Sequence, residues 1–180
     1  MQYFRKINLK CAEQIKEFAI ADTIKQVQDR KFNCQLQVRH SLPSELKNII
    51  NCELSNIGIP EVLYCQTYLR QPNHIQGIHI DGDSQIISCA INIPLKGCAD
   101  SKYNWYDGDY QLERVSRLGL IFHDIKWSTK PVMSATVNLD DAYLIRVDAP
   151  HSAVAGPEER WVFTMRFNGN PLFDDLCNKL

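Results

Sequence analysis

Residues 160–167 read RWVFTMRF and alternate between two kinds of side chain. Successive side chains of a β-strand point to opposite faces, so this alternation predicts a strand with one apolar face. The apolar face would hold Trp161, Phe163, Met165 and Phe167, and the other face would hold Arg160, Val162, Thr164 and Arg166. Similar patterns at 62–70 and 85–93, with shorter candidate strands at 77–81, 119–123 and 142–148, predict a mainly β chain.

Strands with one apolar and one polar face fit two architectures. A two-layer sheet would leave the polar faces in water, whereas a barrel covered by helices would turn them inward to line a pocket. Residues 11–29 and 44–54 show helical spacing, with Ser44 as the expected N-cap of the second helix and Gly58 and Pro60 after its end. Strands that follow helices in one block favour a sheet or barrel backed by N-terminal helices.

The composition is that of an ordinary globular domain. The chain has 180 residues, of which 44% are hydrophobic and 23% charged, so a single domain over 1–180 is expected. We expect residues 1–59 to form mainly helical support and residues 60–168 to form the β core. Lys and Arg (20) nearly balance Asp and Glu (21), giving a net charge of −1. Such a charge does not favour nucleic acid or an anionic membrane as a partner.

The cysteines and the N-terminus indicate a cytoplasmic protein. The seven cysteines are odd in number, widely spaced and without a Cys-x-x-Cys pair, which argues against a disulfide scaffold or a zinc knuckle. Such usage suits a reducing compartment. The N-terminal residues carry scattered charges, which is not typical of a secretory signal. The longest uncharged apolar run, 84–95, is too short to span a bilayer.

One short motif places potential metal ligands together. His79-Ile80-Asp81 puts an imidazole and a carboxylate two residues apart, so on a strand end both point to the same side. His151 is a candidate third ligand. Two histidines and one carboxylate leave three positions of an octahedral metal open, as non-haem Fe(II) oxygenases require. A surface turn with His79 hydrogen-bonded to Asp81 would show the same motif.

Arg160 is a candidate anion receptor. It lies nine residues after His151, beyond a turn, and Thr164 shares its strand face. A buried guanidinium with a hydroxyl nearby binds a small carboxylate through paired, charge-assisted hydrogen bonds. Alternatively, Arg160 pairs with Glu158, Glu159 or another acid at the surface.

Arg166 also lies on the polar face of this strand. An arginine inside a barrel needs an anion. Either an internal acid such as Asp148 or a carboxylate on a substrate would supply it.

The ordered set of His79, Asp81, His151 and Arg160 resembles the Fe(II)/2-oxoglutarate-dependent dioxygenases, whose pattern is His-x-Asp, a distal His, and then an Arg or Lys. The run AINIPL at 90–95 is similar to the strand that follows the motif in many members. The resemblance covers residues 60–168. It implies a double-stranded β-helix, a jelly-roll barrel of the cupin-like kind, with helices packed on one sheet and 60–168 as the catalytic core.

The same resemblance implies roles for individual residues. His79, Asp81 and His151 would hold Fe(II), and 2-oxoglutarate would chelate the metal while Arg160 binds its distal carboxylate. In the family, dioxygen converts the cosubstrate to succinate and CO2, and the prime substrate is usually hydroxylated. Some members use a tyrosine near the position of Asn92, where this chain has none. The expected cosubstrate residues are therefore Arg160, Thr164, Asn92 and Tyr68, and the expected substrate residues are Arg166, Trp105 and Gln66.

We expect a dioxygenase acting on a small molecule, a peptide or a protein. The spacing of Arg160, Thr164 and Arg166 is also similar to that of alkylated-base repair dioxygenases, but Val162 stands where their motif has Asn. Together with the near-neutral charge, this does not favour a nucleic-acid substrate. A cupin-like metalloenzyme that does not use 2-oxoglutarate and a non-catalytic jelly-roll binding module remain alternatives. The prime substrate and the oligomeric state are left open.

Overall fold

The computed structural model describes residues 1–28, 34–82, 85–117 and 120–180. Along the chain, its elements are β1 (Phe4–Lys6), α1 (Ala12–Val27), β2 (Gln35–His40), α2 (Ser44–Asn56), β3 (Val62–Arg70), β4 (Cys89–Lys96), β5 (Lys102–Asp107), β6 (Tyr110–Arg117), β7 (Leu120–Trp127), β8 (Val132–Asn138), β9 (Tyr143–Arg146), β10 (His151–Val154), β11 (Arg160–Phe167) and α3 (Phe173–Cys177). Among the described residues, no helix is long and apolar enough to cross a membrane.

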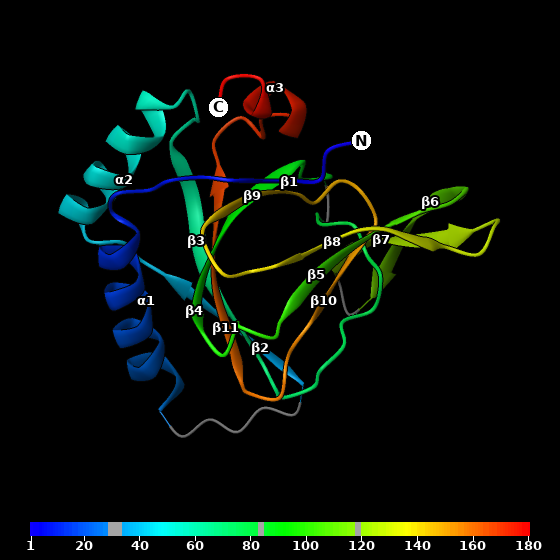
Figure 1. Cartoon of the computed structure of the whole chain (residues 1–180), viewed down its shortest axis with the longest axis horizontal. Coiled ribbons are helices and arrows are strands. Elements are labelled where there is room, and N and C mark those ends of the chain that lie inside the picture. The colour runs from blue at the N-terminus through cyan, green and yellow to red at the C-terminus, as the bar shows by residue number, and fades with distance from the viewer. Residues whose placement is uncertain (29–33, 83–84, 118–119) are drawn as a thin grey trace.

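Two antiparallel sheets form the body of the molecule (Figure 1). The large sheet has the order β1-β9-β4-β11-β3-β2, and the small sheet has the order β10-β5-β8. Isolated bridges from Ile75 to Val154 and from His79 to His151 add the segment after β3 to the edge of the small sheet. From β3 to β11 the chain therefore passes back and forth between the sheets. This is a double-stranded β-helix, so the expected jelly-roll fold is confirmed.

The helices α1 and α2 cover the outer face of the large sheet (Figure 1). The apolar face of β11 packs against them, as its alternating sequence predicts. This outer core includes Ile15 and Ala19 of α1, Ile50 and Leu54 of α2, and Phe163, Met165 and Phe167 of β11. Each large side chain buried in this way contributes about 1.5–3 kcal/mol. The opposite face of β11 is thereby turned toward the small sheet.

A second apolar cluster fills part of the space between the sheets. It includes Ala90, Trp105, Ile145, Ala153 and Val162. Polar side chains occupy the rest of the inner faces, including Arg160, Thr164 and Arg166, all of which are buried. Of the two architectures that the sequence allowed, the structure therefore has the barrel with a polar interior.

Some predicted elements agree with the structure and others differ. The strands 62–70 and 160–167 are β3 and β11, and the two predicted helices correspond to α1 and α2. Ser44 is not an N-cap but the first residue of α2, after Pro43. Residues 77–81 form an isolated bridge rather than a continuous strand. The strand predicted at 85–93 begins only at Cys89, and the N–H of Ile87, just before it, donates instead to the carbonyl of Asp81.

The chain also has strands that the sequence patterns did not indicate. The strands β1 and β2 lie within the first 59 residues and form the two edges of the large sheet, so this region is not only helical. The strands β5, β8 and β10 build the small sheet. The strand predicted at 119–123 lies partly outside the described residues. Its described part belongs to β7, which pairs with β6 as a separate hairpin that extends from the barrel (Figure 1).

Candidate functional site

Backbone pairing brings the His-x-Asp motif to the distal histidine. The N–H of His79 donates to the carbonyl of His151 at 2.9 Å, and the N–H of His151 donates to the carbonyl of His79 at 2.9 Å. This antiparallel pair places both imidazoles on one face, with ring centroids 4.3 Å apart. The N–H of Asp81 donates to the carbonyl of Val147 at 2.9 Å, which fixes the carboxylate beside them.

The three side chains present one ligand atom each to a common point. These atoms of His79, Asp81 and His151 lie within 4.8 Å of one another. The Nδ1 of His79 is 2.9 Å from the carbonyl of Gly77, and the Nδ1 of His151 is 3.0 Å from the carbonyl of Ala149. Since a carbonyl only accepts, each Nδ1 carries the proton and each Nε2 keeps its lone pair.

The donor set fits a divalent first-row metal ion. The Nε2 atoms of His79 and His151 lie 3.2 Å and 3.7 Å from the Asp81 carboxylate. The Nε2 of His151 is buried without a hydrogen-bond partner, as expected for an atom that binds a metal. Two imidazoles and one carboxylate, with a backbone carbonyl bonded to the outer nitrogen of each imidazole, form a set that is typical of non-haem iron sites.

Arg166 determines the charge of Asp81. Burial alone would raise the pKa of the Asp81 carboxyl, but the ion pair with Arg166 and the contacts with the two histidines hold it below its usual value. The guanidinium of Arg166 also donates to the carbonyl of Cys89. Asp81 is therefore ionised and available as a metal ligand at neutral pH.

His151 is the most buried member of the set, with no exposed surface. Burial first, and the neighbouring His79 second, lower the pKa of His151 from 6.5 to about 3. The Tyr103 ring stacks on this imidazole, with ring centroids 5.7 Å apart. His151 is thus neutral over the physiological range, as a metal ligand must be.

We expect the metal-free protein to lose stability as the pH falls from 6.5 toward 3. In this window the unfolded chain takes up a proton at His151 and the folded chain does not, so unfolding becomes more favourable. The contribution is at most about 5 kcal/mol. The lowered pKa of Asp81 acts in the same direction at lower pH.

The measurement is the Tm between pH 4 and pH 7 in the presence of a chelator. The His151→Gln variant should show a shallower dependence than the wild type. Equal slopes for the two proteins would show that His151 does not titrate in this way.

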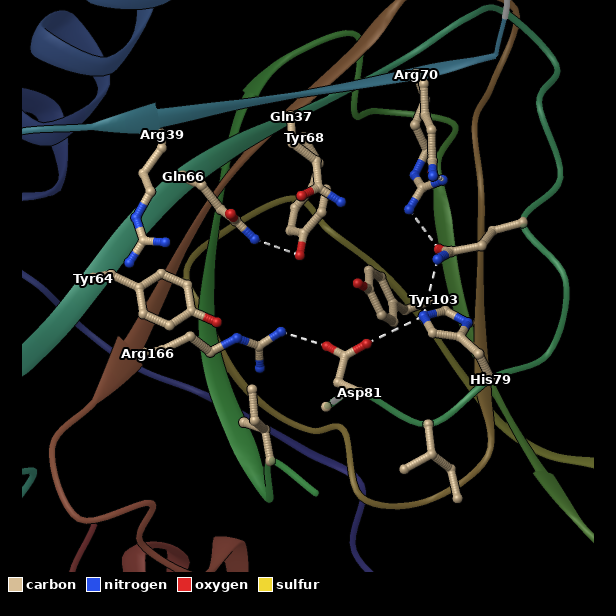
Figure 2. A pocket seen from close by; sticks show the side chains of 15 residues that line it. Gln37, Arg39, Tyr64, Gln66, Tyr68, Arg70, His79, Asp81, Tyr103 and Arg166 are labelled. Atoms are coloured by element: carbon tan, nitrogen blue, oxygen red, sulfur yellow. Dashed lines mark hydrogen bonds and ion pairs between the residues drawn. The ribbon is translucent and has the colours of Figure 1, made fainter. Parts of the chain in front are cut away.

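The three residues adjoin a polar cavity of about 370 Å³ (Figure 2). His79 and Asp81 line it directly, whereas His151 lies behind them. The strands β2 and β3 form the opposite wall. That wall consists of Gln35, Gln37, Arg39, Tyr64, Gln66, Tyr68 and Arg70, and Gln76 and Tyr103 complete the end beside His79.

The residues expected to bind a cosubstrate occupy two positions. Tyr68 lines the cavity and accepts a hydrogen bond from Gln66. Arg160, Thr164 and Asn92 are buried beyond the cavity wall. Thr164 donates to the amide oxygen of Asn92 at 2.8 Å, so its hydroxyl already has a partner. The Arg160 guanidinium carbon lies 5.5 Å from the centre of the Tyr103 ring.

Of the residues expected to bind a substrate, some line the cavity and one does not. Gln66 and Arg166 line the cavity, but Trp105 does not. Trp105 is fully buried between the sheets and donates through its indole N–H to the carbonyl of Arg146. The aromatic ring that reaches the cavity from β5 is Tyr103.

Arg166 has an internal anion, but that anion is not Asp148. Its guanidinium pairs with Asp81. Asp148 instead accepts a hydrogen bond from the Ser88 hydroxyl at 2.7 Å and lies 3.9 Å from Arg146.

The sequence patterns did not indicate that β2 forms part of the cavity wall. They also did not indicate Arg70 and Gln76 as residues of the site. The alternation QLQVR at 35–39 was the available signal, because it places Gln35, Gln37 and Arg39 on one strand face. Gln76 had no periodic signal, since it lies in the irregular segment before the His-x-Asp motif.

No family model matches the chain, and no curated protein matches it. Solved structures do. The structure of EvdMO1 has a TM-score of 0.54 at 11% identity, covering 91% of this chain and 46% of that chain. The viral collagen prolyl hydroxylase vCPH from Paramecium Bursaria Chlorella virus-1, in its 2OG complex, has a TM-score of 0.49 at 12% identity and covers 91% of this chain and 94% of its own.

A prolyl-4-hydroxylase of Pseudomonas putida has a TM-score of 0.46 at 14% identity, covering 94% of this chain and 95% of that chain. At these identities a structural likeness shows the fold and not the reaction. The likeness to EvdMO1, the one of these three structures with a TM-score above 0.5, therefore concerns the fold alone.

Proposed function

We propose that the protein is an Fe(II)- and 2-oxoglutarate-dependent dioxygenase that hydroxylates a small molecule, a peptide or a protein, with release of succinate and CO2. The observation that carries this proposal is the convergence of His79, Asp81 and His151 at the wall of a polar cavity. When bound there, iron would supply the chemistry with dioxygen that protein side chains lack.

The chain's own residues would position the reactants. The carbonyls of Gly77 and Ala149 hold the two imidazoles in the orientation that a metal needs. Arg166 keeps Asp81 ionised and fixes one of its oxygens. Gln66 and Tyr68 supply hydrogen-bonding groups on the facing wall, which suits a polar prime substrate.

The experiment that tests the proposal is an anaerobic calorimetric titration with Mn(II) and then with 2-oxoglutarate. A dioxygenase binds both, and with Fe(II) and air it forms succinate slowly even without a prime substrate. Binding of Mn(II) without 2-oxoglutarate would favour the cupin-like metalloenzyme. Binding of neither would favour the non-catalytic module.

We expect Arg160→Ala to weaken the binding of 2-oxoglutarate while Mn(II) binding survives. Arg160 is 1% exposed, and among the described residues its Nε and Nη2 find no hydrogen-bond partner. Removing one member of a buried charge pair costs about 2–5 kcal/mol, or roughly 30-fold to several thousand-fold in affinity. Calorimetry on the Mn(II)-loaded variant measures this loss.

The matched control is Thr164→Val, which lies on the same strand face. Its hydroxyl is bonded to Asn92, so we expect a loss of about 0.5–1.5 kcal/mol in stability and little change in affinity. An unchanged affinity in Arg160→Ala would place the carboxylate receptor elsewhere.

We further propose that residues 60–168 are the catalytic core, that residues 1–59 support it, and that the protein works in the cytoplasm. All seven cysteines are free thiols, which supports a reducing compartment.

A further inference from the structure

Positive charge is concentrated in the polar cavity. Among the described residues, its lining includes three arginines, Arg39, Arg70 and Arg166, but a single acid, Asp81, although the whole chain has a net charge of −1. Arg166 pairs with Asp81, so the other two charges have no acid to balance them in the described lining. A hollow lined by one sign of charge attracts ligands of the opposite sign.

The reactants of the proposed reaction would not remove this excess. A divalent metal ion and the dianion 2-oxoglutarate carry opposite charges of equal size, so together they add no net charge to the cavity. The positive excess would therefore remain when the prime substrate binds. A prime substrate with a negative charge would be complementary to it.

Arg39 is the arginine at the end of the cavity away from His79 (Figure 2). Its guanidinium lies over the ring of Tyr64, with Cζ 4.4 Å from the ring centroid. Within the described parts of the chain, this guanidinium forms no hydrogen bond and no ion pair. The contact with the ring orients the guanidinium and leaves its N–H groups available to a ligand.

Gln37 adds a neutral donor beside Arg39. Both residues lie on one face of β2 and line the same cavity. The side-chain amide of Gln37 has no hydrogen-bond partner among the described residues, whereas Gln35, the next residue on this face, is bonded to Arg70. A guanidinium and a carboxamide with unused N–H groups form a receptor that suits a carboxylate or a phosphate.

We propose that the prime substrate is a small organic anion whose carboxylate or phosphate group is bound by Arg39 and Gln37. This inference rests on the proposed function for the reaction and names the class of its prime substrate. A volume of about 370 Å³ fits a small molecule. Because Arg39 and His79 lie at opposite ends of the cavity, an anion held by Arg39 directs its carbon chain toward the metal ligands (Figure 2).

Three four-carbon probes test for this receptor: butanoate, butyl phosphate and the neutral butanamide. Each is titrated anaerobically into the protein loaded with Mn(II) and 2-oxoglutarate. The line width of the probe's methyl protons is followed by NMR, since paramagnetic Mn(II) broadens the signals of nearby protons. We expect at least one of the two acids to bind about 10-fold or more tightly than butanamide, because hydrogen bonds between charged groups are the stronger ones. The acid that binds more tightly identifies the anionic group as a carboxylate or a phosphate.

Variants assign the preference for an acid to Arg39. Arg39→Met should remove it, so that the three probes bind equally weakly, and Arg39→Lys should retain part of it, because lysine keeps the charge without the fork. Arg39 is exposed, so the Tm of Arg39→Met should stay within about 2 °C of the wild type. The matched control is Arg114→Met on β6, which removes an equal charge outside the cavity lining and should change no affinity by more than about twofold.

Two results would overturn the inference. In the first, neither acid binds the wild type more tightly than butanamide does. In the second, Arg39→Met keeps the wild-type preference for the acid. In both cases, binding of Mn(II) and 2-oxoglutarate would still support the dioxygenase proposal.

The dioxygenase proposal can fail while the anion receptor stands. If the protein binds Mn(II) but not 2-oxoglutarate, the same probes are titrated into the Mn(II)-loaded protein. If it does not bind Mn(II), the shift in Tm that each probe causes replaces the line width. A preference for an acid that Arg39→Met removes would then support the receptor without the dioxygenase reaction, and the lack of such a preference would overturn both proposals.

Discussion

Replacing His79 by alanine is expected to abolish measurable Mn(II) binding. The three ligand atoms of His79, Asp81 and His151 lie within 4.8 Å of one another, and removing one leaves two ligands that hold a divalent ion poorly. Loss of a group that is hydrogen-bonded to a metal ligand typically costs about 10–100-fold in metal affinity, so loss of the ligand itself should exceed about 100-fold. His79 is partly exposed, so alanine at this position should leave the fold intact.

Titration calorimetry with Mn(II) measures this effect, and far-ultraviolet circular dichroism checks the fold. His151→Ala should give the same loss of binding, although its buried position makes a lower Tm expected as well. His123→Ala is the matched control, because His123 lies on the β6–β7 hairpin outside the cluster. Wild-type affinity in His79→Ala would show that the metal does not bind at this cluster.

The sequence predicted best those strands whose two faces differ most in polarity. The strands β3 and β11 pack one face against helices and turn the other toward the polar interior, so their alternation is strong. The strand β4 is buried from Cys89 to Ile93 on both faces. Its sequence therefore lacks a clear alternation of apolar and polar residues, and its first residue could not be predicted. The strands β5, β8 and β10 are short or irregular, and β8 is mostly exposed. Their places depend on pairing with distant segments, which no local pattern encodes.

In the candidate site too, local features were predictable from the sequence and contacts between distant segments were not. The spacing of His79 and Asp81 on a strand end is local, so their common direction was predictable. The choice of Asp81 over Asp148 as the partner of Arg166 depends on how β11 is placed relative to the segment at 79–81, which only the tertiary structure determines. Trp105 lies in the strand paired with β10, and its indole is enclosed by Tyr3 and Phe4 from the N-terminus. No spacing near Trp105 indicates those contacts.

Arg166→Met is expected to lower the Tm of the metal-free protein by about 6–20 °C. The Arg166 side chain is buried and its guanidinium pairs with Asp81, whose side chain is 19% exposed. Breaking a buried ion pair by removing one partner costs about 3–5 kcal/mol, and for a domain of this size each kcal/mol shifts the Tm by roughly 2–4 °C. Differential scanning calorimetry at pH 7 with a chelator measures the shift.

The pH dependence tests whether Asp81 is the cause. Its folded pKa lies below the ordinary value, so its contribution to stability is present at neutral pH and is lost as the pH falls. The difference in Tm between the wild type and Arg166→Met should therefore shrink below about pH 4. A difference that stays constant with pH would assign the effect to lost packing rather than to the carboxylate.

Metal binding provides the sharper test, because a divalent ion would supply the positive charge that the variant lacks beside Asp81. Saturating Mn(II) should therefore restore more of the Tm in Arg166→Met than it adds to the wild type. Arg146→Met is the matched control, since Arg146 is also buried and pairs with Asp174, away from the three ligands. That variant should be destabilised without selective recovery by Mn(II). Equal recovery in both variants would mean that Arg166 and the metal do not act on the same carboxylate.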